Sequence, residues 1–305
     1  MDFFVQQLVN GLTLGSVYAL LALGYSIVYG ILKLLNFAHG EVYMMGAFMG
    51  YFTLVALGGA ASPAVPVALV LVLMFLVAGL SAGVLGVAIE RFAYRPLRDA
   101  PRIAPLITAL GMSFFLQSTA LLLFSADVRN MDTSELISPS TGIHVGPLDI
   151  SLVRILVILS AALLMVALAR FVAQTKLGKA MRAVAYDREA AEMMGIDVDR
   201  TIVAAFFIGS VLAGAAGVMV GLVFDRVWHL MGFTAGLKAF TAAVVGGIGN
   251  IPGAMLGGLL IGLAEAFTAG YISTTFQNLI VFGILIVVML VRPTGLLGSP
   301  AIEKV

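Results

Sequence analysis

Residues 187–200 read DREAAEMMGIDVDR, and half of these fourteen residues are charged, whereas charged residues make up only 11% of the whole chain. The seven are Asp187, Arg188, Glu189, Glu192, Asp197, Asp199 and Arg200. The chain of 305 residues is 61% hydrophobic and has a mean hydropathy of +1.09. Because a soluble protein of this size cannot bury so many apolar residues, the composition indicates an integral membrane protein. The charged stretch therefore marks a place where the chain lies outside the membrane.

The uncharged runs predict the membrane segments, because a helix needs about 20 apolar residues to cross the hydrocarbon core. Gly58, Gly59, Pro63 and Pro66 divide the long run 42–89 into two. About eight hydrophobic segments result, at roughly 7–30, 42–58, 65–89, 103–124, 152–173, 202–224, 239–268 and 276–291. We therefore expect an all-α polytopic membrane protein in which residues 1–305 form a single transmembrane domain.

The composition also excludes several classes of function. The chain has no Cys, which excludes disulfides, thiolate nucleophiles and Cys-based metal sites. The net charge of +1 does not indicate a nucleic-acid partner. The first basic residue is Lys33, so the N-terminus lacks the basic region of a cleaved signal peptide. We expect the first apolar segment to be retained as a span.

The positions of Lys and Arg predict the topology, because cytosolic loops are enriched in basic residues. Ten of the seventeen basic residues lie in two connections, 91–102 and 170–200, and the intervening loop 125–151 is acidic. We expect the basic connections inside and the acidic loop outside. Counting crossings places the N-terminus outside. The C-terminus is expected inside, provided that one of the later segments is re-entrant.

Two interruptions within apolar sequence are candidates for a transport path. The first, KLLNFAHGEV (33–42), contains Asn36, Phe37, His39, Gly40 and Glu41. It is interpreted either as part of a path or as an ordinary cytosolic loop, and the sequence does not decide between them. In the second, GGIGNIPG (246–253), Gly and Pro weaken the helix, so 239–268 is the expected re-entrant or broken segment. Its candidate path residues are Gly246, Gly247, Gly249 and Asn250.

Glu265 is an acidic residue within an apolar run, which is costly unless the carboxylate faces a partner or water. One interpretation makes it part of the translocation path or a polar lock between helices. The other ends the segment there and places Glu265 at the membrane surface. Trp228, beside His229, is interpreted as an interfacial anchor.

The motifs of enzymes are missing from the sequence. His39, His144 and His229 are far apart, no HExxH or GxSxG motif occurs, and no metal site is expected. KLGKA (176–180) resembles the end of a phosphate loop, but Ala180 replaces the Ser or Thr that would hold Mg²⁺. We therefore expect no cofactor on this chain, and ATP and Mg²⁺ on a partner subunit if the protein uses them.

The inside connection at about 174–200 is too long for a simple turn, and its first half consists of good helix formers. We expect a coupling helix over 181–195, with Gly195 as its stop. Small residues at its middle favour docking into a groove of a soluble partner. The alternative is a helix in the lipid interface, in which Lys176, Lys179 and Arg182 would matter most.

EAAEMMG (189–195) matches the E-A-A-x-x-x-G core of the loop through which permeases of bacterial ABC importers contact their ATPases. The I-x-L-P continuation of that pattern is missing here. The whole chain resembles the LivH-type permease subunits of branched-chain amino acid ABC importers. The resemblance runs through NGLTLGSVYALLALGYSIVYGILKLLNFAHGEVYMMGAF (10–48), IERFAYRPLR (89–98), GKAMRAVAYDREAAEMMGID (178–197), GLKAFTAAVVGGIGNIPGAMLGG (236–258) and RPTGLLG (292–298).

The resemblance implies a multi-pass subunit of the bacterial inner membrane that moves leucine, isoleucine or valine by alternating access. Its implied partners are a second homologous permease, two cytosolic ATPases and a periplasmic amino-acid-binding protein. The implied ATPase-coupling residues are Met181, Arg182, Asp187, Glu189, Ala190, Ala191 and Gly195. Related permeases carry urea or amides, which keeps the solute open. A proton-coupled secondary transporter is a further alternative, in which Glu41 and Glu265 would titrate.

Overall fold

The computed structural model describes residues 2–60, 65–98, 100–101, 103–138, 141–145 and 148–298. Within these residues seven helices are long and apolar enough to cross a membrane, which confirms the expected class of fold. They are α1 (Asp2–Leu32), α3 (Val67–Ile89), α4 (Ile103–Phe124), α6 (Leu152–Gln174), α9 (Val198–Phe224), α11 (Ile251–Tyr271) and α12 (Gln277–Val291). A π-helical turn (Glu90–Tyr94) and a 3₁₀ turn (Arg95–Leu97) extend α3, and a 3₁₀ turn (Thr274–Phe276) precedes α12.

Two further helices, α2 (His39–Ala56) and α10 (Met231–Gly246), complete the bundle. The expected segment 239–268 is therefore two helices, α10 and α11, joined by a turn at 247–250. The break was predicted, but the start of α10 was not. Lys238 was expected at the edge of an apolar run, whereas this lysine is buried inside α10.

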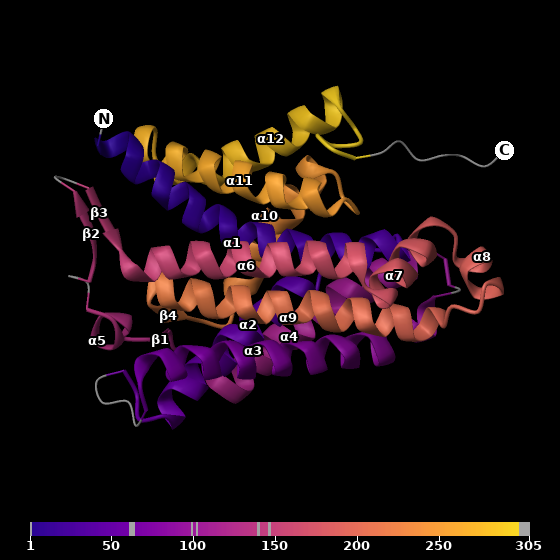
Figure 1. The fold of residues 1–305 in the computed structure, drawn as a ribbon, viewed down its shortest axis with the longest axis horizontal. Helices are drawn as coiled ribbons and strands as arrows, with labels where there is room; N and C mark the ends of the chain where they lie inside the picture. Colours follow the sequence, from indigo (N-terminus) through magenta and orange to yellow (C-terminus); the bar gives the residue numbers. More distant parts are fainter. Residues whose placement is uncertain are drawn as a thin grey trace.

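The connections gather at two opposite ends of the molecule (Figure 1). One end carries the N-terminus and the acidic connection, with α5 (Thr133–Leu136) and two small antiparallel pairings. The pairings join β1 (Arg129–Asn130) to β4 (Arg226–Val227) and β2 (Gly142–Val145) to β3 (Leu148–Ser151). The other end carries α7 (Lys176–Tyr186) and α8 (Arg188–Met193). These strands are a small addition to the all-α fold that the sequence predicted.

The two basic connections lie at the same end, as expected. Arg95, just beyond α3, forms an ion pair with Asp199 at the start of α9, and Arg98 pairs with both Asp199 and Glu90. The turn between α10 and α11 also lies at this end, because Gly249 lines a cavity together with Met181 of α7. We call this the α7 end of the molecule.

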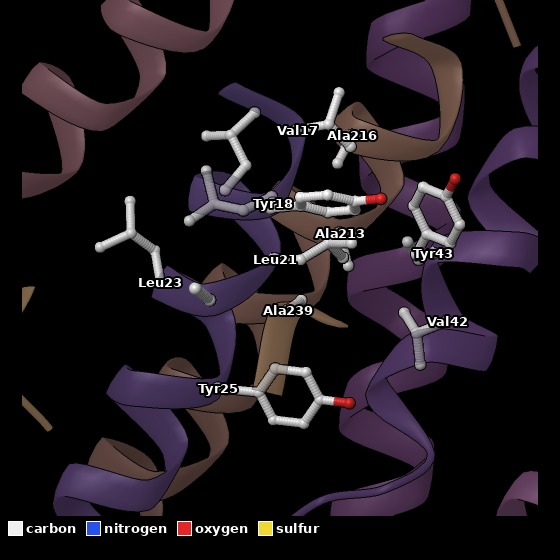
Figure 2. Close-up of a cluster of buried hydrophobic side chains, with 14 of the residues drawn as sticks. Val17, Tyr18, Leu21, Leu23, Tyr25, Val42, Tyr43, Ala213, Ala216 and Ala239 are labelled. Atoms are coloured by element: carbon white, nitrogen blue, oxygen red, sulfur yellow. The ribbon is translucent and has the colours of Figure 1, made fainter. Parts of the chain in front are cut away.

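The interior is held together by close contacts between small residues, which drive the association of helices in membranes. Figure 2 shows Tyr18 and Leu21 of α1 near Tyr43 of α2, with Ala213 and Ala216 of α9 beside them, and all five are buried. Helices α1, α2, α9 and α10 therefore form the centre of the bundle. Helices α3, α4, α6 and α12 lie outside them and expose many large apolar side chains.

The Cys-free background allows a direct test of topology. We expect single cysteines at Ala100 and Lys179 to react with an impermeant thiol reagent from the same side of the membrane, and a cysteine at Ser134 to react from the other side. The positive-inside rule predicts that the shared side is the cytosol. Reaction of the first two cysteines from opposite sides would contradict the arrangement of the α7 end.

Candidate translocation and coupling sites

The first candidate path segment is buried. Asn36, His39 and Glu41 have almost no exposed surface, which rules out the alternative of an exposed cytosolic loop for 36–41. Tyr94 donates a hydrogen bond to Asn36 Oδ1 at 3.1 Å, and this bond ties the segment to the end of α3. Phe37 is half-buried, with its ring centroid 6.1 Å from that of Phe240 in α10. Helix α2 thus begins inside the bundle.

The buried carboxylate of Glu41 is stabilised by neutral donors and by a helix terminus. Ser113 Oγ and Gln117 Nε2, both of α4, donate to Glu41 Oε1 at 3.1 and 2.8 Å. The other oxygen, Oε2, has no hydrogen-bond partner and points at Gly232, where an added Cβ would lie 2.5 Å from it. Gly232 is in the first turn of α10, and a helix N-terminus carries a partial charge of about +0.5. The start of α10 therefore offsets part of the cost of a buried charge.

A buried ion pair joins three helices in the middle of the bundle. Lys238 Nζ of α10 lies 2.6 Å from Glu265 Oε1 of α11, and Tyr18 of α1 donates to Glu265 Oε2 at 2.9 Å. Glu265 is only 5% exposed, so the interpretation that placed it at the membrane surface is wrong. Its surroundings are those of a polar lock between helices. Lys238 was not predicted as the partner of Glu265, although opposite charges in two consecutive apolar segments indicate such a pair.

The second candidate path segment is held by hydrogen bonds from residues 296 and 297, a contact that was not predicted from the sequence. The backbone N–H groups of Leu296 and Leu297 donate to the carbonyls of Val245 and Gly246 at 2.9 Å each. Asn250 Nδ2 donates to the carbonyl of Leu297 at 2.7 Å. The motif RPTGLLG thus satisfies the last carbonyl groups of α10, which would otherwise lack partners.

The candidate path residues do not converge on one site. Residues 36–41 adjoin the start of α10, Glu265 contacts its middle, and 246–250 is its end. A helix of 16 residues is about 24 Å long, so Glu41, at the first turn of α10, is far from the 246–250 turn, whereas Phe37 contacts Phe240 less than two turns before the end of α10. Helix α10 is the element that connects them, and their role in a path stays a prediction.

Gly295 has a φ of +78° and fits tightly against the turn. A Cβ at this position would lie 2.5 Å from the carbonyl oxygen of Val244 and 2.6 Å from the nitrogen of Gly247. We expect Gly295→Ala to lower the unfolding midpoint more than Gly249→Ala does. The control residue also has a positive φ, of +89°, but an added Cβ there would meet only Gly30, at 3.6 Å. Each change carries a left-handed backbone cost of about 1–2 kcal/mol, so equal midpoints would contradict the closing role of residues 295–297.

The coupling segment is two helices, and the single helix expected over 181–195 is wrong. Asp187 interrupts it, because this residue is extended and its carboxylate accepts from the N–H of Ala190 at 3.1 Å as the N-cap of α8. Gly195 ends α8 with a φ of +80°, which agrees with its expected role as a stop. Asp197 caps α9 by accepting from the N–H of Arg200 at 3.0 Å.

The break changes which residues face outward. Met181 and Ala191, expected at the partner surface, are buried against their own chain because α7 and α8 pack on the bundle. Arg182, Glu189 and Ala190 are exposed, and Asp187 is half-buried. The apolar side chains that face solvent are Tyr186 (80% exposed), Met193 (87%) and Met194 (83%), and we call these three the docking patch. Tyr186 and Met193 were not predicted at this surface, because one continuous helix was expected over 181–195.

The structure does bring members of both candidate groups together at the α7 end. Met181 and Arg182 from the coupling group, and Gly249 and Asn250 from the path group, line one cavity of about 550 Å³. We call it the α7 pocket. Helix α7 and the turn between α10 and α11 therefore face each other across this cavity.

Seven apolar helices of membrane-spanning length, with α2 beginning inside the bundle, are typical of a polytopic membrane transport protein. The family model described as "Branched-chain amino acid transport system / permease component" matches residues 7–290, and the chain belongs to this family. No solved structure matches it.

Three relatives illustrate the breadth of the family. The high-affinity branched-chain amino acid transport system permease protein BraD of Pseudomonas aeruginosa is 44% identical over 305 residues, which are 99% of this chain and 98% of that protein. LivH of Salmonella typhimurium, with the same description, is 43% identical over 307 residues and covers the same shares. LivM, a further permease protein of that organism, is 28% identical over 314 residues, which are 93% of this chain and 68% of LivM.

Proposed function

We propose that this chain is the permease subunit of an ATP-driven importer of leucine, isoleucine and valine in the bacterial inner membrane. Family membership and the names of BraD and LivH support the substrate class. The resemblance to both LivH and LivM supports a second, homologous permease as the partner across the path. A periplasmic binding protein delivers the solute, and two cytosolic ATPases supply ATP and Mg²⁺.

The observation that carries the coupling part of this proposal is the docking patch. Within the described part of the chain, these three large apolar side chains on and next to α7 and α8 are exposed to solvent, and clustered exposed apolar residues mark protein interfaces. Exposed acidic and basic residues surround them, including Arg182, Glu189 and Glu192. This mixture of charges fits the rim of a protein contact better than a helix lying on lipid, which is typically basic.

Alternating access requires that the ATPases move the permease. ATP brings the two ATPases together, their movement shifts α7 and α8, and α7 acts on the 246–250 turn through the α7 pocket. The glycines of 36–41 and of α10 allow close backbone approach, so a small displacement alters the packing of both interrupted segments. The sequence has few ionisable residues within its apolar runs, which suits a solute with an apolar side chain.

We expect Met194→Asp to reduce ATP-driven uptake roughly tenfold or more, since a charge in a docked apolar patch costs at least about 1.4 kcal/mol of binding. The unfolding midpoint of the isolated permease should stay unchanged, because Met194 is exposed. Ala191→Asp should behave differently and lower that midpoint, since Ala191 is buried in its own chain. Uptake and ATPase co-purification measure the first effect, and thermal unfolding measures the second.

Ser134→Asp is the matched control for Met194→Asp, because it also adds an exposed charge but at the opposite end of the molecule. It should leave ATPase binding intact. Normal ATPase binding and uptake with Met194→Asp, combined with losses from Lys176→Gln and Lys179→Gln, would instead support a lipid-surface role for α7.

A further inference from the structure

The α7 pocket has the dimensions and the lining of a small-molecule site. It is bounded by the last turns of α1 and α6, by α7, and by residues 248–252. Its volume of about 550 Å³ lies within the range of roughly 300–1,000 Å³ that is usual for such sites. Ile27, Ile31, Val172, Ile248 and Ile251 give it apolar walls.

The charges in the α7 pocket have one sign. Lys33 and Arg182 line it, and none of its lining residues is acidic. Neither cation has a carboxylate partner in the described part of the chain: Lys33 lies 5.9 Å from the ring centroid of Tyr29, and Arg182 donates to the carbonyl of Val172 at 2.6 Å. The pocket therefore attracts an anion and repels a cation.

The N-terminus of α11 borders the pocket at Asn250 and Ile251, but it is already capped, because Asn250 Oδ1 accepts from the N–H of Gly253 at 3.0 Å and Pro252 has no N–H. Ser26 also borders the pocket, but its Oγ is fully buried and a ligand in the cavity does not reach it. Lys33 and Arg182 are therefore the groups that can receive an oxyanion.

We propose that the α7 pocket binds a small monocarboxylate with a short aliphatic chain. Lys33 and Arg182 receive the carboxylate, and the isoleucine and valine side chains enclose the hydrocarbon. An ammonium group is not required, because the lining offers no acidic side chain to pair with it. This separates the ligand from a transported amino acid, whose two charges would both need partners.

Binding has a consequence that rests on the proposed function. A molecule held between α7 and residues 248–252 restrains these two elements relative to one another. Because α7 must shift the turn during each cycle, the carboxylate inhibits uptake from the α7 side of the membrane. A deaminated, carboxylate-bearing product of the imported solute would in this way slow further import.

The test uses 4-methylpentanoate as the probe and 3-methylbutylamine as a cation of similar size. Isothermal titration is carried out on the full-length chain, with its partner subunits, in phosphatidylcholine nanodiscs. We expect the carboxylate to bind and the amine not to bind. Binding of both alike, or of neither, would overturn the proposal.

Two variants assign the binding to the pocket. Lys33→Asn removes one cation and keeps a residue type that tolerates the φ of +56° at this position. Gly30→Leu fills the cavity, and its Cβ would lie 3.8 Å from Gly249, an ordinary contact that preserves the fold. Each should weaken binding at least tenfold, whereas Lys179→Asn, an equal loss of charge on the exposed face of α7, should not. Undiminished binding in both pocket variants would place the carboxylate elsewhere.

A lipid phosphate shares the oxyanion chemistry of the probe, so one arm replaces phosphatidylcholine with phosphatidylglycerol. Unchanged affinity supports the small carboxylate. If phosphatidylglycerol competes with the probe for binding, and Lys33→Asn removes this competition, the pocket is a lipid headgroup site and the proposal is overturned. Because binding is measured without transport, failure of the proposed function would leave this result intact.

Discussion

Lys238→Met is expected to destabilise the protein by about 3–5 kcal/mol, because it leaves the carboxylate of Glu265 buried without its counter-charge. The side chains of this pair are 9% and 7% exposed, so water cannot take the place of the missing partner. The hydroxyl group of Tyr18 would remain as a donor, but a neutral donor replaces only part of an ion pair. Unfolding of the protein in detergent, monitored through the loss of its helical signal, measures the change in stability.

The double variant Lys238→Met with Glu265→Gln provides the decisive comparison. It removes both charges, so it should be more stable than Lys238→Met alone although it carries more substitutions. Tyr18→Phe is the milder reference, with an expected loss of about 1.5–3 kcal/mol for one hydrogen bond to a charged group. A double variant that is less stable than both Lys238→Met and Glu265→Gln would show that the side chains of Lys238 and Glu265 do not act as a pair.

Gly262→Leu is expected to be the second most damaging change. Its Cβ would overlap the backbone of Gly15, and the two glycines belong to facing small-xxx-small pairs: Gly11 and Gly15 on α1, Gly258 and Gly262 on α11. An added Cβ on Gly15 would in turn lie 2.8 Å from the Cα of Leu259. The helices must separate to admit leucine, which costs about 3 kcal/mol or more in overpacking and lost contacts.

A matched control is available on α12. Gly283 is also a glycine within an apolar helix, but nothing lies within 4 Å of an added Cβ. Gly283→Leu should therefore leave the unfolding midpoint and the yield of folded protein nearly unchanged, and Gly262→Ala should fall between the two leucine variants. Equal tolerance of leucine at positions 262 and 283 would refute the close packing of α1 on α11.

The long helices were predictable because their signal is local. Runs of about 20 uncharged residues identified every long span, and the basic residues correctly grouped the connections 91–102 and 170–200 at one end. The break at 246–253 was also predictable, since Gly and Pro weaken a helix wherever it packs.

The rest depended on contacts between distant residues. A charged residue was expected to lie in a connection between two membrane segments. This rule fails for Lys238, because Glu265 on another helix compensates its charge. The break in the coupling segment at Asp187 was missed because Asp can occur within a helix as well as cap one, and the cap forms only where the chain bends. The partner of the 246–250 turn lies in RPTGLLG, and no periodic pattern connects these two stretches.

The hydrogen bonds from Leu296 and Leu297 to the end of α10 also set an order of assembly. During synthesis α10 and α11 leave the ribosome long before residues 296 and 297, so the final carbonyls of α10 wait without their partners. The hairpin can enter the membrane but reaches its final geometry only after α12 has crossed and returned the chain to the α7 end. Nascent chains arrested before residue 295 should therefore contain a loosely closed hairpin, whose final geometry forms only when residues 296 and 297 arrive.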